Sequence, residues 1–154
     1  MRGIIRLAAT ALLVATAAPA AAQQFQLGIT ADDLRDRGTA ATFGLEYRSA
    51  PLTTLGAAPL RLAVAGEVDT RGDVWGGAGP ALTVPVGDAL RLDASVMPGV
   101  TAGGGDDGTE FALRSRLGLS VPIAAGWRGS VILTHRSNVD DQVSIGFGVS
   151  AGGF

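Results

Sequence analysis

The chain has 154 residues, a formal net charge of −2, no cysteine, and hydrophobic residues at 47% of its positions. This length corresponds to one domain. The absence of cysteine excludes a disulfide framework and a thiolate metal site, and the mixture of Arg with Asp and Glu gives no basic surface of the kind that nucleic-acid binding requires.

The first 22 residues predict a cleaved export signal. Arg2 and Arg6 give a basic start, an apolar stretch follows at 7–18, and small residues occupy 20–22. This order is that of a secretory signal peptide, and the apolar stretch is shorter than the ~20 residues that a membrane-spanning helix needs. We therefore expect a signal peptide at 1–22 and one mature domain at 23–154.

From residue 23 onward, apolar and polar residues alternate with the period of two that is typical of β-strands. Turn-rich clusters divide this pattern into eight segments, which are 24–31, 41–49, 60–69, 74–86, 89–102, 109–121, 126–137 and 142–153. Eight is an even number, as single-chain bacterial outer-membrane barrels require. Alternation by itself also fits a soluble, secreted β-sandwich, which remains the alternative fold.

The connections between these segments favour the barrel. Those after even segments are apolar and contain proline, as in 84–88 and 121–126, whereas those after odd segments are acidic and flexible, as in 69–73 and 103–108. That rhythm predicts a meander with one periplasmic and one outer end. The chain also ends in an aromatic residue, Phe154. We predict an all-β fold, an eight-stranded antiparallel up-and-down transmembrane β-barrel in the cell outer membrane.

The charged face of each strand is expected to point into the barrel, where an eight-stranded wall leaves room only for side chains. We interpret these residues as structural ion pairs of the lumen. They are Glu46, Arg48, Arg61, Glu67, Arg91, Asp93, Glu110, Arg114, Arg116, Arg128 and Arg136.

The one histidine of the chain, His135, stands two residues before Ser137, so a strand would place both side chains on one face. Counting back through Val131 and Leu133, that face is the apolar one. Polar groups on a lipid-facing surface are costly and therefore indicate function. His135 could act as a base and Ser137 as a nucleophile for acyl transfer, and the neighbouring Asn138 could stabilise the oxyanion.

The run Thr134-His135-Arg136-Ser137-Asn138, followed by one last strand, resembles the motif of the PagL-type lipid A deacylase family. The resemblance implies an outer-membrane barrel that hydrolyses the ester-linked acyl chain at the 3 position of lipid A without a metal or other cofactor. It assigns the base to His135, the nucleophile to Ser137 and an oxyanion contact to Asn138. The resemblance also implies that lipopolysaccharide is the substrate and that outer-membrane lipids are the partners of the barrel.

The sequence departs from this family at one position. The family has a glutamate on its last strand that orients the histidine, whereas 142–154 contains no carboxylate here. The substitutes are Asp140 and Asp141, and a tight turn would bring Asp141 opposite Ser137 and diagonal to His135. Both aspartates can equally be read as a solvated turn.

Two alternatives to the hydrolase remain open at this point. A relative that has lost its activity is one, and a non-enzymatic small barrel that stabilises the membrane or displays its loops is the other. The sequence also leaves the oligomeric state open, a homodimer being one alternative.

Overall fold

The computed structural model describes residues 24–32, 40–103, 108–137 and 141–152. Nine β-strands lie within these ranges: β1 (Gln24–Asp32), β2 (Ala40–Arg48), β3 (Thr53–Leu55), β4 (Ala58–Asp69), β5 (Val74–Val86), β6 (Leu90–Ala102), β7 (Thr109–Ala124), β8 (Trp127–Ser137) and β9 (Gln142–Gly152). The predicted signal peptide at 1–22, the predicted oxyanion residue Asn138 and the terminal Phe154 lie outside the described residues. In the described part of the chain, no helix is long and apolar enough to cross a membrane.

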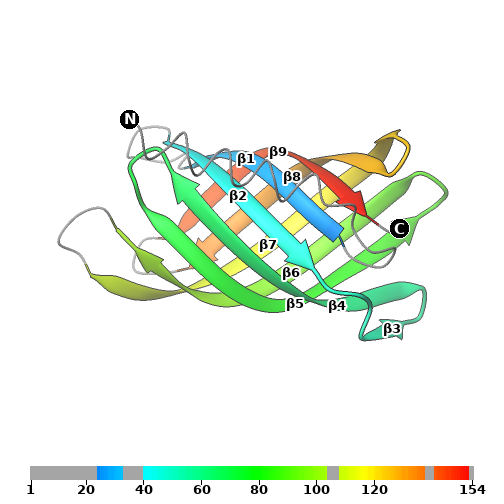
Figure 1. The fold of residues 1–154 in the computed structure, drawn as a ribbon, viewed down its shortest axis with the longest axis horizontal. Coiled ribbons are helices and arrows are strands. Elements are labelled where there is room, and N and C mark those ends of the chain that lie inside the picture. The colour runs from blue at the N-terminus through cyan, green and yellow to red at the C-terminus, as the bar shows by residue number, and fades with distance from the viewer. Residues whose placement is uncertain (1–23, 33–39, 104–107, 138–140, 153–154) are drawn as a thin grey trace.

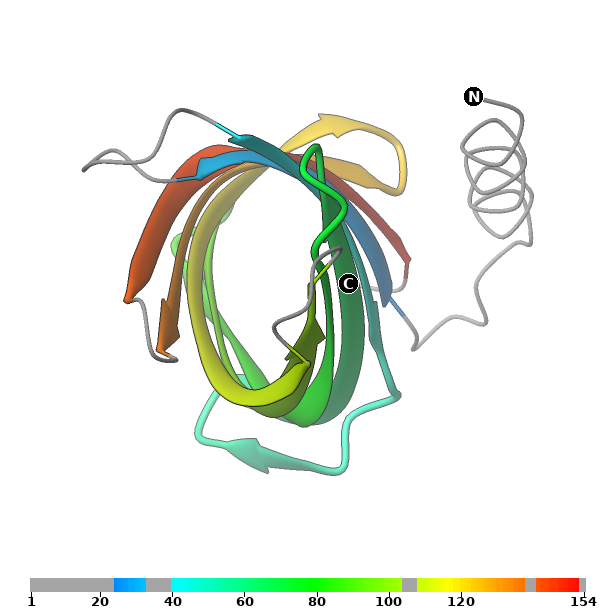
Figure 2. The same ribbon diagram turned by 90° about the vertical axis from the view of Figure 1, so that its left-hand side faces the viewer.

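The strands form one closed antiparallel sheet. Their order is β2-β1-β9-β8-β7-β6-β5-β4-β3, and a further pairing of β2 with β4 joins the two ends. Figure 2 shows the resulting cylinder in end view. β2 and β4 meet through register pairs such as Phe43 with Val68. Closure gives the backbone of the wall its hydrogen bonds without an open edge, as a bilayer demands. The predicted eight-stranded barrel is therefore confirmed, and the β-sandwich alternative is wrong.

The ninth strand, β3, is an addition that the sequence did not predict. It pairs with β4 alone, from Thr53 opposite Leu60 to Leu55 opposite Ala58, and projects beyond the barrel as a short hairpin (Figure 1). Gly56 closes this hairpin with a φ of +62°, a conformation that favours glycine. The alternation places 50–59 between two predicted strands, because the three residues of β3 are too few to show a period of two.

The outer face of the wall is mostly apolar. On β8, Val131 and Leu133 are about half exposed, and on β9 so is Ile145, while Phe147 is 74% exposed. Soluble proteins rarely expose an apolar surface that continues around a whole molecule. The exterior therefore faces lipid, and together with the closed barrel it supports the predicted outer-membrane location.

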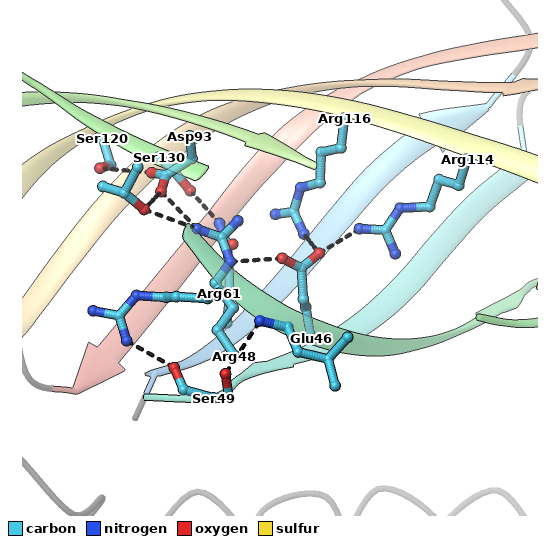
Figure 3. A network of polar contacts seen from close by, with 12 residues as sticks. Glu46, Arg48, Ser49, Arg61, Asp93, Arg114, Arg116, Ser120 and Ser130 are labelled. Carbon is cyan, nitrogen blue, oxygen red and sulfur yellow. Dashed lines mark hydrogen bonds and ion pairs between the residues drawn. The ribbon is translucent and has the colours of Figure 1, made fainter. Parts of the chain in front are cut away.

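The lumen holds most of the predicted ion pairs. Glu46, 1% exposed, binds Arg48 at 2.7 Å and Arg116 at 2.9 Å, and also contacts Arg114 (Figure 3). Arg48 continues to Asp93 at 2.6 Å. Since an uncompensated charge at such depth is strongly destabilising, these contacts fix how β2, β6 and β7 face one another across the interior.

Further lumen residues bind one another or the backbone. Glu67 pairs with Arg136 and lies 3.3 Å from Arg114, and Arg128 donates to the carbonyl of Ser120 at 2.8 Å. Glu110 is the exception among the predicted lumen residues, since it is exposed. It is the second residue of β7, opposite Thr101, and lies at the rim, where no side chain among the described residues pairs with it. The prediction that Glu110 pairs inside the barrel is therefore wrong.

One part of the lumen is apolar, which the charged alternation did not predict. Trp75 is buried with Met97 and a set of alanines, and Arg114 lies over its ring with the guanidinium carbon 5.0 Å from the centroid. Gly77 and Gly99 make room for the indole, because a Cβ at either position would meet the ring at less than 3.0 Å. Side chains therefore pack the interior at this level.

Candidate active site at the end of β8

The alternation along β8 decides where the candidate residues point. Ile132 and Thr134 are buried inside the barrel, whereas Val131 and Leu133 are exposed on the outside. His135 and Ser137 have the same parity as Val131 and Leu133 and continue this outward row, which we call the β8 stripe (Val131, Leu133, His135 and Ser137). β8 ends at Ser137, at the opposite end of the barrel from the last residues of β9 (Figure 1). A base and a hydroxyl therefore end a stripe that is otherwise apolar.

The neighbouring strands surround these two residues with further outward side chains. On the β7 side, Ser115 is the register partner of His135, and Leu113 is that of Ser137. On the β9 side, Val143 is the partner of His135. Directly paired side chains on one face have Cβ atoms about 5 Å apart, so each of these groups borders the candidate site.

Asp141, the residue immediately before β9, lies beside the site. Arg136 pairs with Gln142, so Asp141 comes one step further along, on the level of Ser137. Its Oδ1 lies 3.8 Å from Nε2 of His135, with the side chains 69% and 45% exposed. That distance is longer than a hydrogen bond, and it places a carboxylate beside the imidazole. The structure thus brings His135 and Asp141 together; their catalytic roles stay predictions.

The sequence interpretation missed Ser115. The outward row of β7 consists of Phe111, Leu113, Ser115, Leu117 and Leu119. The signal in the sequence is Ser115 itself, a polar residue that interrupts an apolar row at the level of the one histidine. Asn138 and Asp140, the two other residues considered for this site, lie outside the described residues.

The chemistry available to this group is acyl transfer by a hydroxyl, a base and a carboxylate. Within the described ranges, no three His, Cys, Asp or Glu side chains gather as a metal site would require. The site is open to the lipid phase along the β8 stripe and to the rim at Asp141. It therefore suits a substrate with an apolar chain and a polar linkage.

Comparison with known proteins gives the fold. No family model and no curated protein matches the sequence. Among solved structures, a de novo designed transmembrane β-barrel superposes with a TM-score of 0.62 at 10% identity, covering 86% of this chain and 95% of the other. The outer-membrane protein Ail of Yersinia pestis gives 0.57 at 10% identity over 84% and 97%.

The outer-membrane enzyme PagL is also similar in structure. Its TM-score is 0.55 at 17% identity, and the match covers 83% of this chain and 98% of PagL. At such identities the likeness extends to the fold, that of small outer-membrane barrels. Because the group contains an enzyme as well as other barrels, the fold leaves the activity undecided.

Proposed function

We propose that the chain is an outer-membrane ester hydrolase that removes an ester-linked acyl chain from the lipid A part of lipopolysaccharide. The observation that carries this proposal is the outward placement of His135 and Ser137 at the end of β8, with Asp141 Oδ1 3.8 Å from His135 Nε2. If His135 and Ser137 had a purely structural role, they would stabilise the barrel more from the lumen, where polar side chains find hydrogen-bond partners. On the outside, these groups meet lipids.

The reaction divides into two acyl transfers. Ser137 Oγ attacks the ester carbonyl while His135 Nε2 takes the hydroxyl proton, and the resulting imidazolium is stabilised by the nearby Asp141 carboxylate. The bond between the carbonyl carbon and the sugar oxygen then breaks, and the imidazolium returns the proton to the leaving alkoxide. Water attacks the acyl-enzyme in the same way, which releases the fatty acid and restores Ser137. Asn138 is the proposed oxyanion contact.

The apolar surface beside the site would bind the acyl chain. Leu133 pairs with Leu117 on β7 and with Ile145 on β9, and all three face outward below His135. An acyl chain that lies along them stays in a hydrocarbon environment, so little desolvation opposes binding. The ester, at the polar end of the chain, then reaches the level of His135 and Ser137.

The test is the mass of lipid A after incubation of purified lipopolysaccharide with the folded barrel. We expect loss of one hydroxyacyl group with the wild type, no loss with Ser137→Ala or His135→Ala, and normal loss with Ser150→Ala, a serine at the opposite end of the barrel. Unchanged lipid A with folded wild type, or normal turnover by Ser137→Ala, would contradict the proposal.

A non-enzymatic barrel is the second candidate function. Two observations favour it: β9 carries no carboxylate in the sequence QVSIGFGVSAG, and Ail, an attachment invasion locus protein, shares the fold. The lipid A measurement separates the two candidates, since only the hydrolase changes the mass of the lipid.

A further inference from the structure

Ser115 stands directly across from His135 on the neighbouring strand. The β7–β8 register pairs Ser115 with His135, Leu113 with Ser137 and Leu117 with Leu133. Ser115 is half-buried, whereas Arg114 and Arg116 on either side of it point into the lumen and contact Glu46. Its side chain therefore faces outward on the same surface as the His135 ring.

The surroundings of Ser115 make a hydroxyl unexpected there. The outward residues before and after it on β7 are Leu113 and Leu117, which are 36% and 50% exposed, and Val100 and Phe111 continue the apolar surface toward the rim. A hydroxyl on a lipid-facing surface is costly unless it forms a hydrogen bond. With Cβ atoms about 5 Å apart in a direct cross-strand pair, the imidazole is within reach of that hydroxyl.

One ring nitrogen of His135 lies near the carboxylate of Asp141. Nε2 is the nitrogen that lies 3.8 Å from Asp141, which precedes β9, on the far side of β8 from β7. Nδ1 is the other ring nitrogen, separated from Nε2 by Cε1. A neutral imidazole carries one proton, and the hydrogen bond made by one nitrogen decides whether the other is free to act as a base.

We propose that Ser115 is a positioning residue whose Oγ accepts a hydrogen bond from Nδ1–H of His135 and so leaves Nε2 unprotonated at the Ser137 end. The hydroxyl of Ser115 thereby holds the ring from β7, in a barrel whose last described strand supplies no carboxylate for that purpose. The catalytic consequence rests on the proposed hydrolase function. The contact itself does not.

The contact is tested by nitrogen NMR of the isotope-labelled full barrel in lipid nanodiscs, prepared without a histidine tag. Because the chain has a single histidine, every imidazole signal reports on His135. Ser115→Thr and Ser115→Val form a matched pair of similar shape, and the first retains the hydroxyl. Both residues favour strands, so both variants should fold.

We expect wild type and Ser115→Thr to show the neutral ring protonated at Nδ1, and Ser115→Val to move toward the form protonated at Nε2. If the valine variant keeps the wild-type tautomer, the inference is overturned. In lipid A hydrolysis, Ser115→Val should lower kcat about tenfold with little change in KM, and Ser115→Thr should stay within about twofold of wild type.

The two readouts separate this inference from the proposed function. If wild type hydrolyses no acyl chain but the tautomer changes in Ser115→Val, the hydrolase fails and the Ser115 contact stands. If wild type hydrolyses lipid A and Ser115→Val equals it in both tautomer and kcat, the hydrolase stands and the role of Ser115 is wrong. Covalent labelling of Ser115 instead of Ser137 by an alkyl phosphonate would also overturn a positioning role, since Ser115 would then be the nucleophile.

Discussion

Asp141 Oδ1 lies 3.8 Å from His135 Nε2, although the two residues come from the two sides of 138–140. The register of β8 and β9 brings them to neighbouring levels, because Arg136 pairs with Gln142 and Asp141 is the next residue toward the rim. Asp141 itself lies just outside the paired residues, so the pairing brings its main chain near His135.

Removing this carboxylate should slow the proposed hydrolysis without unfolding the barrel. Asp141→Asn keeps the shape of the side chain but loses the charge that would stabilise the imidazolium, so we expect kcat to fall about tenfold, which corresponds to about 1.4 kcal/mol of transition-state stabilisation. The measurement is the rate of acyl loss from lipid A. Asp88→Asn, an exposed aspartate in the turn before β6, is the control and should have no effect.

A double-mutant cycle shows whether Asp141 acts through the ring. In a His135→Ala background, Asp141→Asn should cause no further loss of activity, because the two groups work as a unit. Independent, multiplicative losses would mean that Asp141 contributes in another way, for instance by binding the lipid headgroup.

The lumen network should contribute much of the stability of the barrel. Glu46→Gln removes the charge shared by Arg48, Arg114 and Arg116, and this leaves positive charge buried without compensation. Breaking a buried ion pair from one side typically costs about 3 kcal/mol or more. The free energy of unfolding in urea, followed by heat-sensitive gel migration, measures the loss.

Glu110→Gln is the matched control for this experiment. Glu110 is exposed at the rim of β7, so its neutralisation should change the unfolding free energy by no more than about 0.5 kcal/mol. Equal losses in the two variants would show that the lumen ion pairs do not differ in effect from a rim charge.

Close packing around Trp75 makes a second, independent prediction. A Cβ at position 99 would lie 2.4 Å from the carbonyl oxygen of Gly76 and 2.7 Å from the Trp75 ring, whereas a Cβ at Gly76 meets nothing within 4 Å. Overpacking of this kind costs about 1–3 kcal/mol, so Gly99→Ala should destabilise the barrel and Gly76→Ala should not. Unfolding curves followed by tryptophan fluorescence compare the two, and equal midpoints would contradict the packing described.

The apolar exterior predicts a dependence on depth in the membrane. Leu117 lies near the middle of β7 and is 50% exposed, whereas Ile123 lies near its end. Leu117→Arg should lower the stability in lipid vesicles by about 2–4 kcal/mol, and Ile123→Arg by about 1 kcal/mol or less. If both variants lose the same amount, β7 does not span the bilayer as its register implies.

The features that depend on alternation could be predicted from the sequence. A period of two gives the strands and the inward or outward side of each residue, so Glu46 and Arg116 were expected inside, and His135 and Ser137 outside. Alternation also fits a β-sandwich, so the closed form was predicted from the even number of segments and from the alternating character of their connections.

Other features depend on contacts between distant segments, which alternation does not contain. The position of Trp75 in the lumen requires glycine at both 77 and 99, which are register partners on the neighbouring strands β5 and β6, and glycine has no hydropathy signal of its own. Ser115 can be recognised as a candidate residue only from its pairing with His135 on another strand. Glu110 has the parity of a lumen residue, but the ends of the wall decide that it lies at the rim.

The side chains that fill the interior, from Glu46 to Trp75, have a consequence for how any lipid meets this molecule. Because these side chains pack the interior of the described barrel, an encounter takes place on the curved outer wall, by sideways diffusion of lipids within one leaflet. The rate of such encounters follows the mole fraction of the lipid in the membrane and the local fluidity. Diluting that lipid with inert detergent should therefore slow its encounters with the wall even at constant bulk concentration.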